Sequence, residues 1–228
     1  MAYAAEIRQL DTQFARVIDT LKSLDQYDNT LIVFLSDHGE QFQEHGESAH
    51  AKSLFEEELR IPLHIKLPGN DFAGAERKEV VAMEGLPATL LELIDMDPPD
   101  TFEGKSFADA LHREMFSEEV ATATLRFDDR LLHMARNYDY KYIYDAVRGQ
   151  DRWYDLLEDR DEIDPLSEPP EGAEHLRSIA RYAAVRDAAG LHIQLNDSGT
   201  FEVTIDGEEM GTPTVTDGDV SKEEPHIR

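Results

Sequence analysis

The chain has 228 residues, of which 40% are hydrophobic, so it is long enough to bury a substantial core. Its 49 acidic residues outnumber its 22 basic residues and give a net charge of −27, which argues against binding to nucleic acid or to anionic membrane surfaces. The absence of cysteine excludes disulfides, zinc–thiolate sites and a thiol nucleophile from these residues.

The acidic residues are spread along the whole chain, which argues against a local acidic arm and predicts adaptation to high salt. An acidic protein from an ordinary cytosol is the alternative. Glu6 and Arg8 interrupt the first ten residues and no apolar run reaches about 18 residues, so we expect a cytoplasmic protein with no membrane partner. Circular dichroism should show helix loss when potassium chloride is diluted below about 0.1 M. An unchanged signal would contradict the salt adaptation.

The first part of the chain alternates between helical and extended patterns. Apolar residues at helical spacing predict an amphipathic helix over residues 4–24. The apolar run 31–35 predicts a strand covered on both faces, as in a parallel sheet. A polar loop at 41–52, a short helix at 53–59 and a second strand at 61–67 follow. This alternation predicts an α/β sheet with flanking helices.

The second part changes character after two short helices predicted at 87–94 and 106–111. Apolar runs predict an antiparallel hairpin or meander over 119–126, 131–136 and 140–144. Residues 172–189 should be helical, and 191–195 with 200–205 should form a hairpin. We therefore divide the chain into an α/β core at 1–114, a small antiparallel α+β subdomain at 115–206 and a disordered tail at 207–228.

Asp37 and His38 follow the predicted strand directly, and Gly39 would let the backbone turn there. Ligand sites in open α/β sheets lie at such strand ends. His50 and Lys52 follow within fifteen residues of Asp37, so the loop could hold an anionic ester beside a metal. The alternative for Asp37 and His38 is a carboxylate that caps a turn next to a solvated imidazole. His45, in the same loop, is equally compatible with a solvent-facing side chain.

Residues 29–69, with the sequence NTLIVFLSDHGEQFQEHGESAHAKSLFEEELRIPLHIKLPG, resemble the sulfatase family of the alkaline phosphatase superfamily. The likeness extends over residues 1 to about 165. It implies an alkaline phosphatase-like α/β sheet, present here in part. It also implies that Asp37 and His38 ligate one divalent cation, with Ca²⁺ or Mn²⁺ favoured and Zn²⁺ or Mg²⁺ as further candidates. His50 and Lys52 would then contact the anionic substrate and stabilise its charge.

One departure from the family is specific. Sulfatases carry a Cys- or Ser-x-Pro-x-Arg segment whose first residue becomes the formylglycine nucleophile, whereas the single Ser-x-Pro here, at 167–169, is followed by Pro170 and Glu171. The chain is therefore identified as the carboxy-terminal portion of a sulfatase-type hydrolase of sulfuric esters. A missing N-terminal half or another chain would supply the nucleophile that acts on the small anionic ester.

Two alternatives stay open. The first is a phosphoric or phosphonate ester hydrolase, or a phosphoethanolamine transferase, of the same superfamily. The second is a degenerate, non-catalytic binding module that keeps the fold.

Overall fold

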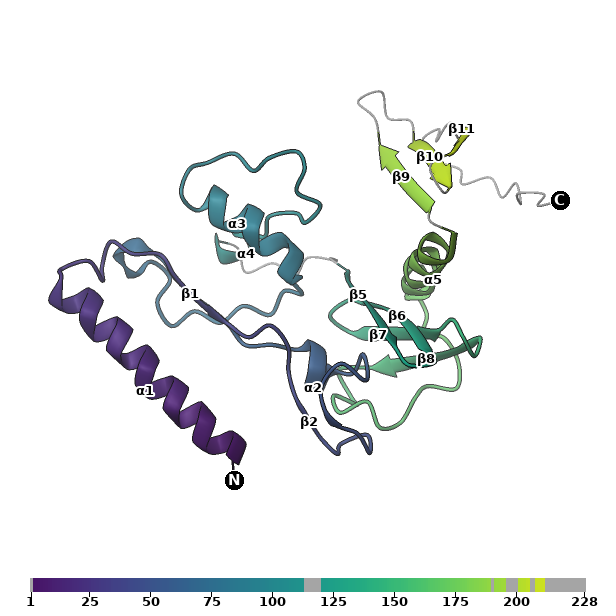
Figure 1. The fold of residues 1–228 in the computed structure, drawn as a ribbon, viewed down its shortest axis with the longest axis horizontal. Coiled ribbons are helices and arrows are strands. Elements are labelled where there is room, and N and C mark those ends of the chain that lie inside the picture. Colours follow the sequence, from purple (N-terminus) through teal and green to yellow (C-terminus); the bar gives the residue numbers. More distant parts are fainter. Residues whose placement is uncertain (1, 113–119, 190, 196–200, 206–207, 212–228) are drawn as a thin grey trace. The chain divides into compact units, whose positions relative to one another are not determined.

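The computed structural model of the protein describes residues 2–112, 120–189, 191–195, 201–205 and 208–211 (Figure 1). The chain divides into two compact units. Unit 1 comprises Met1–Ala51 and Phe55–Glu119, and unit 2 comprises Lys52–Leu54 and Val120–Arg228. Unit 2 is therefore discontinuous in sequence. Among the described helices, none has both the length and the apolar character needed to cross a bilayer.

Unit 1 alternates helices with short strands, as the sequence pattern predicts. Two 3₁₀ turns lie at Pro68–Asn70 and Met83–Gly85. The helices and strands are, in chain order, α1 (Ala2–Ser23), β1 (Ile32–Leu35), β2 (Gln41–Phe42), β3 (Ser48–Ala49), α2 (Glu56–Leu59), β4 (Leu63–Lys66), α3 (Leu86–Glu92) and α4 (Ala108–His112).

Helix α1 has the predicted apolar stripe, but only part of that stripe is covered. Phe14 packs on Phe34 of β1 with ring centroids 5.1 Å apart. Ile7, Leu10 and Val17 are each more than half exposed. Helix α1 thus contacts β1 through Phe14, while these three residues present apolar side chains to solvent.

The parallel pairing expected of the first strand is not what β1 makes with β4. These two strands run antiparallel, from Ile32 opposite Lys66 to Leu35 opposite Leu63, and form a two-stranded sheet. All four residues of β1 are half-buried, so the expected cover on both faces is absent in the described residues. The Lys66 ammonium donates to the backbone oxygens of Tyr27 and Thr30, which holds β4 against the start of β1.

Close approach of backbones fixes the region between α3 and α4. A Cβ atom on Gly104 would lie 1.9 Å from the carbonyl oxygen of Glu84, so only glycine fits there. Thr89 in α3 bridges the same segments, because its hydroxyl donates to the Gly85 oxygen at 2.7 Å and accepts from the Phe107 amide at 2.9 Å. These contacts secure the turn that precedes α4.

Unit 2 contains an antiparallel meander covered by a helix, and a second small sheet. Its first sheet has the order β5-β6-β7-β8, and α5 packs on β6 and β7. The second sheet has the order β11-β10-β9. Residues 212–228 of the predicted tail lie outside the described residues, and its first described residues form β11. The elements are β5 (Ala121–Phe127), β6 (Arg130–Arg136), β7 (Tyr140–Asp145), β8 (Gln150–Asp155), α5 (Glu174–Ala189), β9 (Leu191–Leu195), β10 (Phe201–Ile205) and β11 (Glu208–Gly211).

The antiparallel pairing of β5 with β6, β6 with β7 and β9 with β10 confirms the predicted hairpins. Strand β8 was not predicted. The core between the meander and α5 brings Tyr142 and Trp153 against Leu176 and Ala180. One ion pair lies inside unit 2: Lys141 Nζ is 2.9 Å from Glu162 Oε1, and both side chains are fully buried.

Asp145 ends β7 and holds the turn that follows it. Its carboxylate accepts the backbone amides of Val147 and Arg148, both at 3.0 Å, and pairs with the Arg148 guanidinium at 2.9 Å. Burial acts to raise the pKa of Asp145, but these hydrogen bonds outweigh burial and hold that pKa below its ordinary value. The stability that ionised Asp145 contributes is therefore present above about pH 3.9 and is lost as the pH falls through the folded-state pKa.

Asp145→Asn should consequently lower the free energy of unfolding at pH 7 by about 1.5–3 kcal/mol, the usual worth of hydrogen bonds to a charged group. The difference from the unsubstituted protein should begin to shrink as the pH falls below about 3.9, because the unfolded chain then binds a proton at Asp145 that the folded chain binds only at lower pH. Urea unfolding followed by the fluorescence of Trp153, the single tryptophan, measures both values. A difference that stays constant between pH 7 and pH 3.5 would contradict this assignment.

A candidate metal and anion site

Asp37 and His38 lie just beyond the end of β1, so the alternation of side chains along a strand no longer separates them. His38 Nε2 is 3.7 Å from Asp37 Oδ1. The His38 backbone amide donates to the same oxygen at 3.0 Å, and the Ser36 hydroxyl donates to the His38 carbonyl oxygen at 2.6 Å. The Asp37 side chain is 86% exposed and that of His38 is 43% exposed. The structure thus brings the two predicted ligands together at an accessible position.

Gly39 has a different role from the one expected of it. It is not among the residues with positive φ, so the backbone turn does not require its conformational freedom. Its amide instead donates to the Glu58 carbonyl oxygen at 2.7 Å, and a Cβ atom here would lie 1.9 Å from the Glu57 carbonyl oxygen. Gly39 therefore lets the Asp37–His38 turn pack directly on the backbone of α2.

The imidazole of His38 is oriented by the backbone. Its Nδ1 lies 2.7 Å from the Gly39 carbonyl oxygen, which makes Nδ1 the donor and leaves the Nε2 lone pair on the side of Asp37. The hydrogen bond to Gly39 raises the pKa of His38; burial acts in the opposite sense, and the charges of Asp37, Glu40 and Glu58 add to the increase. Protons therefore compete with a cation for Nε2.

The distance between Nε2 and Oδ1 is compatible with a shared cation. Metal–ligand bonds of about 2.1 Å allow two ligand atoms to be at most roughly 4.2 Å apart. Closed sites usually take at least about four ligands, however, and in the described part of the chain no group of three or more His, Asp or Glu residues is placed to hold a metal ion. Asp37 and His38 therefore fit a divalent cation as part of a ligand set.

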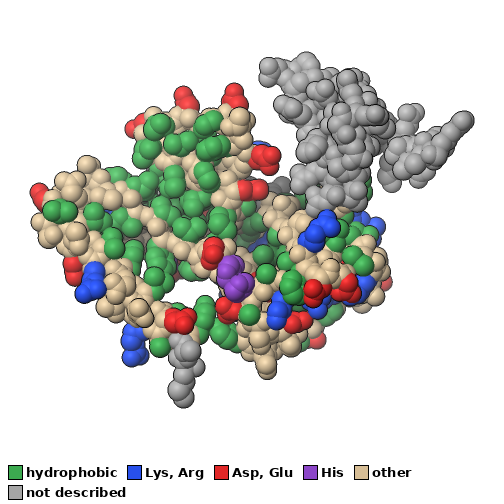
Figure 2. Space-filling model, in the orientation of Figure 1, with side chains coloured by type: hydrophobic (Ala, Val, Ile, Leu, Met, Phe, Trp, Pro, Cys, Tyr) green, Lys and Arg blue, Asp and Glu red, His purple; other side chains and the backbone are tan. Residues whose placement is uncertain are grey.

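His50 is brought to His38 by a hairpin that was not predicted. Strands β2 and β3 pair antiparallel, with Gln41 opposite Ala49, inside the stretch expected to be a polar loop. The His50 ring follows β3 and lies 4.0 Å from the His38 ring, centroid to centroid, and its Nδ1 is 3.5 Å from Glu40 Oε2. Figure 2 shows histidine side chains gathered beside acidic ones on one face. This arrangement places a second imidazole next to the candidate metal ligands.

Lys52 belongs to unit 2, unlike the three residues above. Its carbonyl oxygen accepts a hydrogen bond of 2.9 Å from Arg130 Nη1, and its side chain is half-buried. The next two residues, Ser53 and Leu54, are buried. The backbone of Lys52 is therefore held by unit 2 itself.

A family model of known proteins matches the first 96 of the 228 residues. Residues 1–96 match the family model named Sulfatase. These 96 residues form a segment that is similar to the sulfatase family. The chain is also 28% identical to an arylsulfatase of Clostridium perfringens over 186 residues, an alignment that covers 78% of this chain and 38% of that protein. The chain thus spans about two fifths of the length of this sulfatase relative.

Solved structures confirm the predicted alkaline phosphatase-like α/β fold class of the sulfatases. The putative sulfatase YidJ from Bacteroides fragilis superimposes with a TM-score of 0.66 at 20% identity, covering 80% of this chain and 41% of that one. The phosphonate monoester hydrolase of Agrobacterium radiobacter superimposes with a TM-score of 0.62 at 23% identity, covering 87% and 43%. Both likenesses concern the fold.

Within the sulfatase segment, sequence analysis did not single out the partners that hold the loop. His45 is not solvent-facing: its Nδ1 lies 2.6 Å from Glu57 Oε1, and each of these side chains is 14% exposed. The His45 ring stacks on Phe55 at 3.7 Å, and the buried Gln41 amide donates to the same Glu57 oxygen at 2.8 Å. The hairpin that carries His50 is thus anchored to the start of α2. The acidic run directly after Phe55 was the one available signal.

Proposed function

We propose that this chain is part of a metal-dependent hydrolase of sulfuric esters. The observation that carries the proposal is the position of Asp37 and His38 beyond β1, with Nε2 and Oδ1 3.7 Å apart and the His50 ring beside them. A carboxylate and an imidazole with a free lone pair suit a divalent cation, and a second imidazole suits an anion held next to it. The substrate class that fits is a small anionic ester.

In this proposal the chemistry of each side chain determines its role in the site. Asp37 and His38 would hold the divalent cation, which when bound polarises the ester oxygens. His50 and Lys52 would contact the anionic oxygens and stabilise the charge that develops on them. Ca²⁺ or Mn²⁺ is favoured, and the imidazole ligand also admits Zn²⁺. The other ligands and the nucleophile would come from polypeptide outside these 228 residues.

A phosphonate ester hydrolase is the second candidate. It is favoured by the fold likeness to the phosphonate monoester hydrolase, which covers 87% of this chain. Sulfate and phosphonate groups share tetrahedral geometry and anionic oxygens, so His50 and Lys52 could serve either one. A phosphonate monoester and a sulfate monoester each carry one negative charge, so the two candidates differ in the atom and the substituents at the centre of the tetrahedral group and not in the charge that the anion contacts must offset.

A divalent cation should raise the melting temperature of the full chain, because it binds the folded state and not the unfolded one. At ten times the dissociation constant the gain is about 1.4 kcal/mol, or roughly 3–6 °C for a chain of this size. Asp37→Ala combined with His38→Ala should abolish this increment. Differential scanning fluorimetry with Ca²⁺, Mn²⁺, Mg²⁺ and Zn²⁺ measures it.

The matched control is Glu174→Ala with His175→Ala, which removes another adjacent and exposed acid–imidazole pair. This control should keep the full cation increment, whatever its effect on the melting temperature in the absence of cation. An increment that survives in the Asp37/His38 double variant would refute the proposed metal ligands. Adding inorganic sulfate, phosphate or methylphosphonate to the cation-bound chain then ranks the two candidate functions by their further increments.

A further inference from the structure

Three residues of the sulfatase segment, Lys52–Leu54, pack with unit 2 although the chain on both sides of them belongs to unit 1. Ser53 is 6% exposed and Leu54 is 3% exposed, so both are fixed by burial. Lys52 comes immediately before them, and its carbonyl oxygen accepts the Arg130 guanidinium at 2.9 Å across 78 positions of sequence. The backbone of Lys52 is therefore fixed by the hydrogen bond to its carbonyl oxygen and by the burial of the two residues that follow it.

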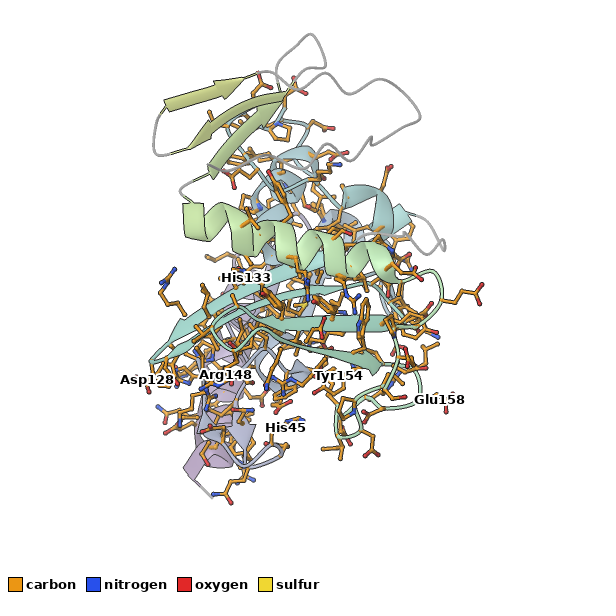
Figure 3. All side chains as sticks on the ribbon, turned by 90° about the vertical axis from the view of Figure 1, so that its right-hand side faces the viewer. His45, Asp128, His133, Arg148, Tyr154 and Glu158 are labelled. Carbon is orange, nitrogen blue, oxygen red and sulfur yellow. The ribbon has the colours of Figure 1, made fainter. Side chains whose placement is uncertain are left out.

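The backbone position of Arg130 is itself fixed by neighbouring contacts. It is the first residue of β6 and pairs with Phe127 across the tight turn that ends β5. In that turn Asp129 is 2.7 Å from the Arg148 guanidinium, and the Ala146 amide donates to the Leu131 carbonyl oxygen at 2.8 Å. Asp128 and Arg148 lie at the same end of the meander (Figure 3). The position of the Arg130 side chain is thus set by two turns linked to one another.

We propose that Arg130 is a positioning residue, which fixes the backbone of Lys52 so that its ammonium can meet a tetrahedral anion. A lysine side chain loses much rotamer freedom when it binds an anion, and a fixed main chain limits what else must be ordered. A guanidinium suits this task because it is planar, permanently charged and rigid as a donor. Its positive charge also strengthens the local potential that attracts the anion. This inference rests on the anion contact proposed for Lys52.

The experiment uses the full chain with ¹³C-labelled lysine side chains, in concentrated potassium chloride. Inorganic sulfate should shift one of the seven lysine signals in a saturable way, and Lys52→Arg identifies that signal by its disappearance. Arg130→Met should weaken the affinity of the Lys52 signal for sulfate by about tenfold, because one hydrogen bond from a charged donor is lost. Arg130→Lys keeps a donor and the charge and should recover part of the affinity.

The matched control is Arg126→Met, which removes an equal charge from an exposed position of the same hairpin. It should leave sulfate affinity within about twofold of the original. A normal affinity in Arg130→Met, whatever happens to its melting temperature, would overturn the positioning role and leave the proposed function intact. If sulfate shifts no lysine signal in the unsubstituted chain, the anion contact of Lys52 is refuted, and the positioning role with it. If Arg130→Met does not fold, Arg130→Lys becomes the deciding variant. A sulfate affinity of Arg130→Lys equal to the affinities of the unsubstituted chain and of Arg126→Met would also overturn the positioning role.

Discussion

Lys141→Met should lower the free energy of unfolding of unit 2 by about 3–5 kcal/mol. The substitution removes the ammonium that lies 2.9 Å from the fully buried Glu162 carboxylate, and breaking a buried ion pair by removing one partner costs about this much. A loss of that size is a large share of the roughly 5–15 kcal/mol that holds a typical domain together. Urea unfolding followed by Trp153 fluorescence reports the effect directly, because Trp153 lies in the core of unit 2.

The double variant Lys141→Met with Glu162→Met tests the reason for the loss. Replacing both members of a buried pair with apolar side chains is often neutral, so the double variant should be more stable than Lys141→Met alone. Lys78→Met, which removes the same charge from an exposed position, should change stability by less than about 0.5 kcal/mol. A Lys141→Met chain with an unchanged urea midpoint would show that the pair does not stabilise unit 2.

Gly39→Ala should disable the candidate metal site and destabilise unit 1. The new Cβ atom would lie 1.9 Å from the Glu57 carbonyl oxygen and 3.2 Å from Glu58 Cα, and these backbone atoms cannot rotate away. The turn must therefore move off α2, which breaks the hydrogen bond from the Gly39 amide to Glu58. Overpacking of this kind costs about 1–3 kcal/mol, and a displaced turn no longer sets His38 Nε2 against Asp37. Scanning fluorimetry should show a lower melting temperature and no increment with divalent cations.

Gly46→Ala provides the matched control, because Gly46 lies in the nearby hairpin and no atom comes within 4 Å of its added Cβ. Its φ of 78° makes alanine strained by about 1–2 kcal/mol, so both variants should be destabilised. Only Gly39→Ala should lose the cation increment. A full increment in Gly39→Ala would mean that the close approach to α2 does not determine the geometry of Asp37 and His38.

Local periodicity explains why much of the fold could be predicted. The apolar spacing of α1 and the hydrophobic runs of β1, β4, β6 and β7 are signals that a few residues carry by themselves. Strands β2 and β3 have only two residues each, and their hairpin depends on positive φ at Gln43, Gly46 and Ala49, which no periodicity reveals. Strand β8 begins with polar and charged residues and was missed for that reason. The direction of the β1–β4 pairing depends on the chain path between the strands, which their own apolar runs do not encode.

The candidate site likewise has features that could be predicted from local sequence and features that could not. The adjacency of Asp37 and His38 after a strand is a local pattern, and it was predicted. The contact of His50 with His38 depends on the unpredicted hairpin, and that of Arg130 with Lys52 joins residues 78 positions apart. Sequence reasoning also places lysine and glutamate at the surface, so the buried pair of Lys141 and Glu162 gave no signal.

The discontinuity of unit 2 has a consequence for the order of folding during synthesis. Lys52–Leu54 leave the ribosome long before the rest of unit 2, since β5 to β8 follow only after residue 120. Leu54 therefore lacks the residues of unit 2 with which it packs until they have been synthesised, and the Lys52 carbonyl oxygen lacks its hydrogen bond until Arg130 has emerged from the ribosome. A nascent chain stopped shortly before residue 120 would hold the strand end of Asp37 and His38 without the support that fixes Lys52, so completion of this region is coupled to translation of the second unit.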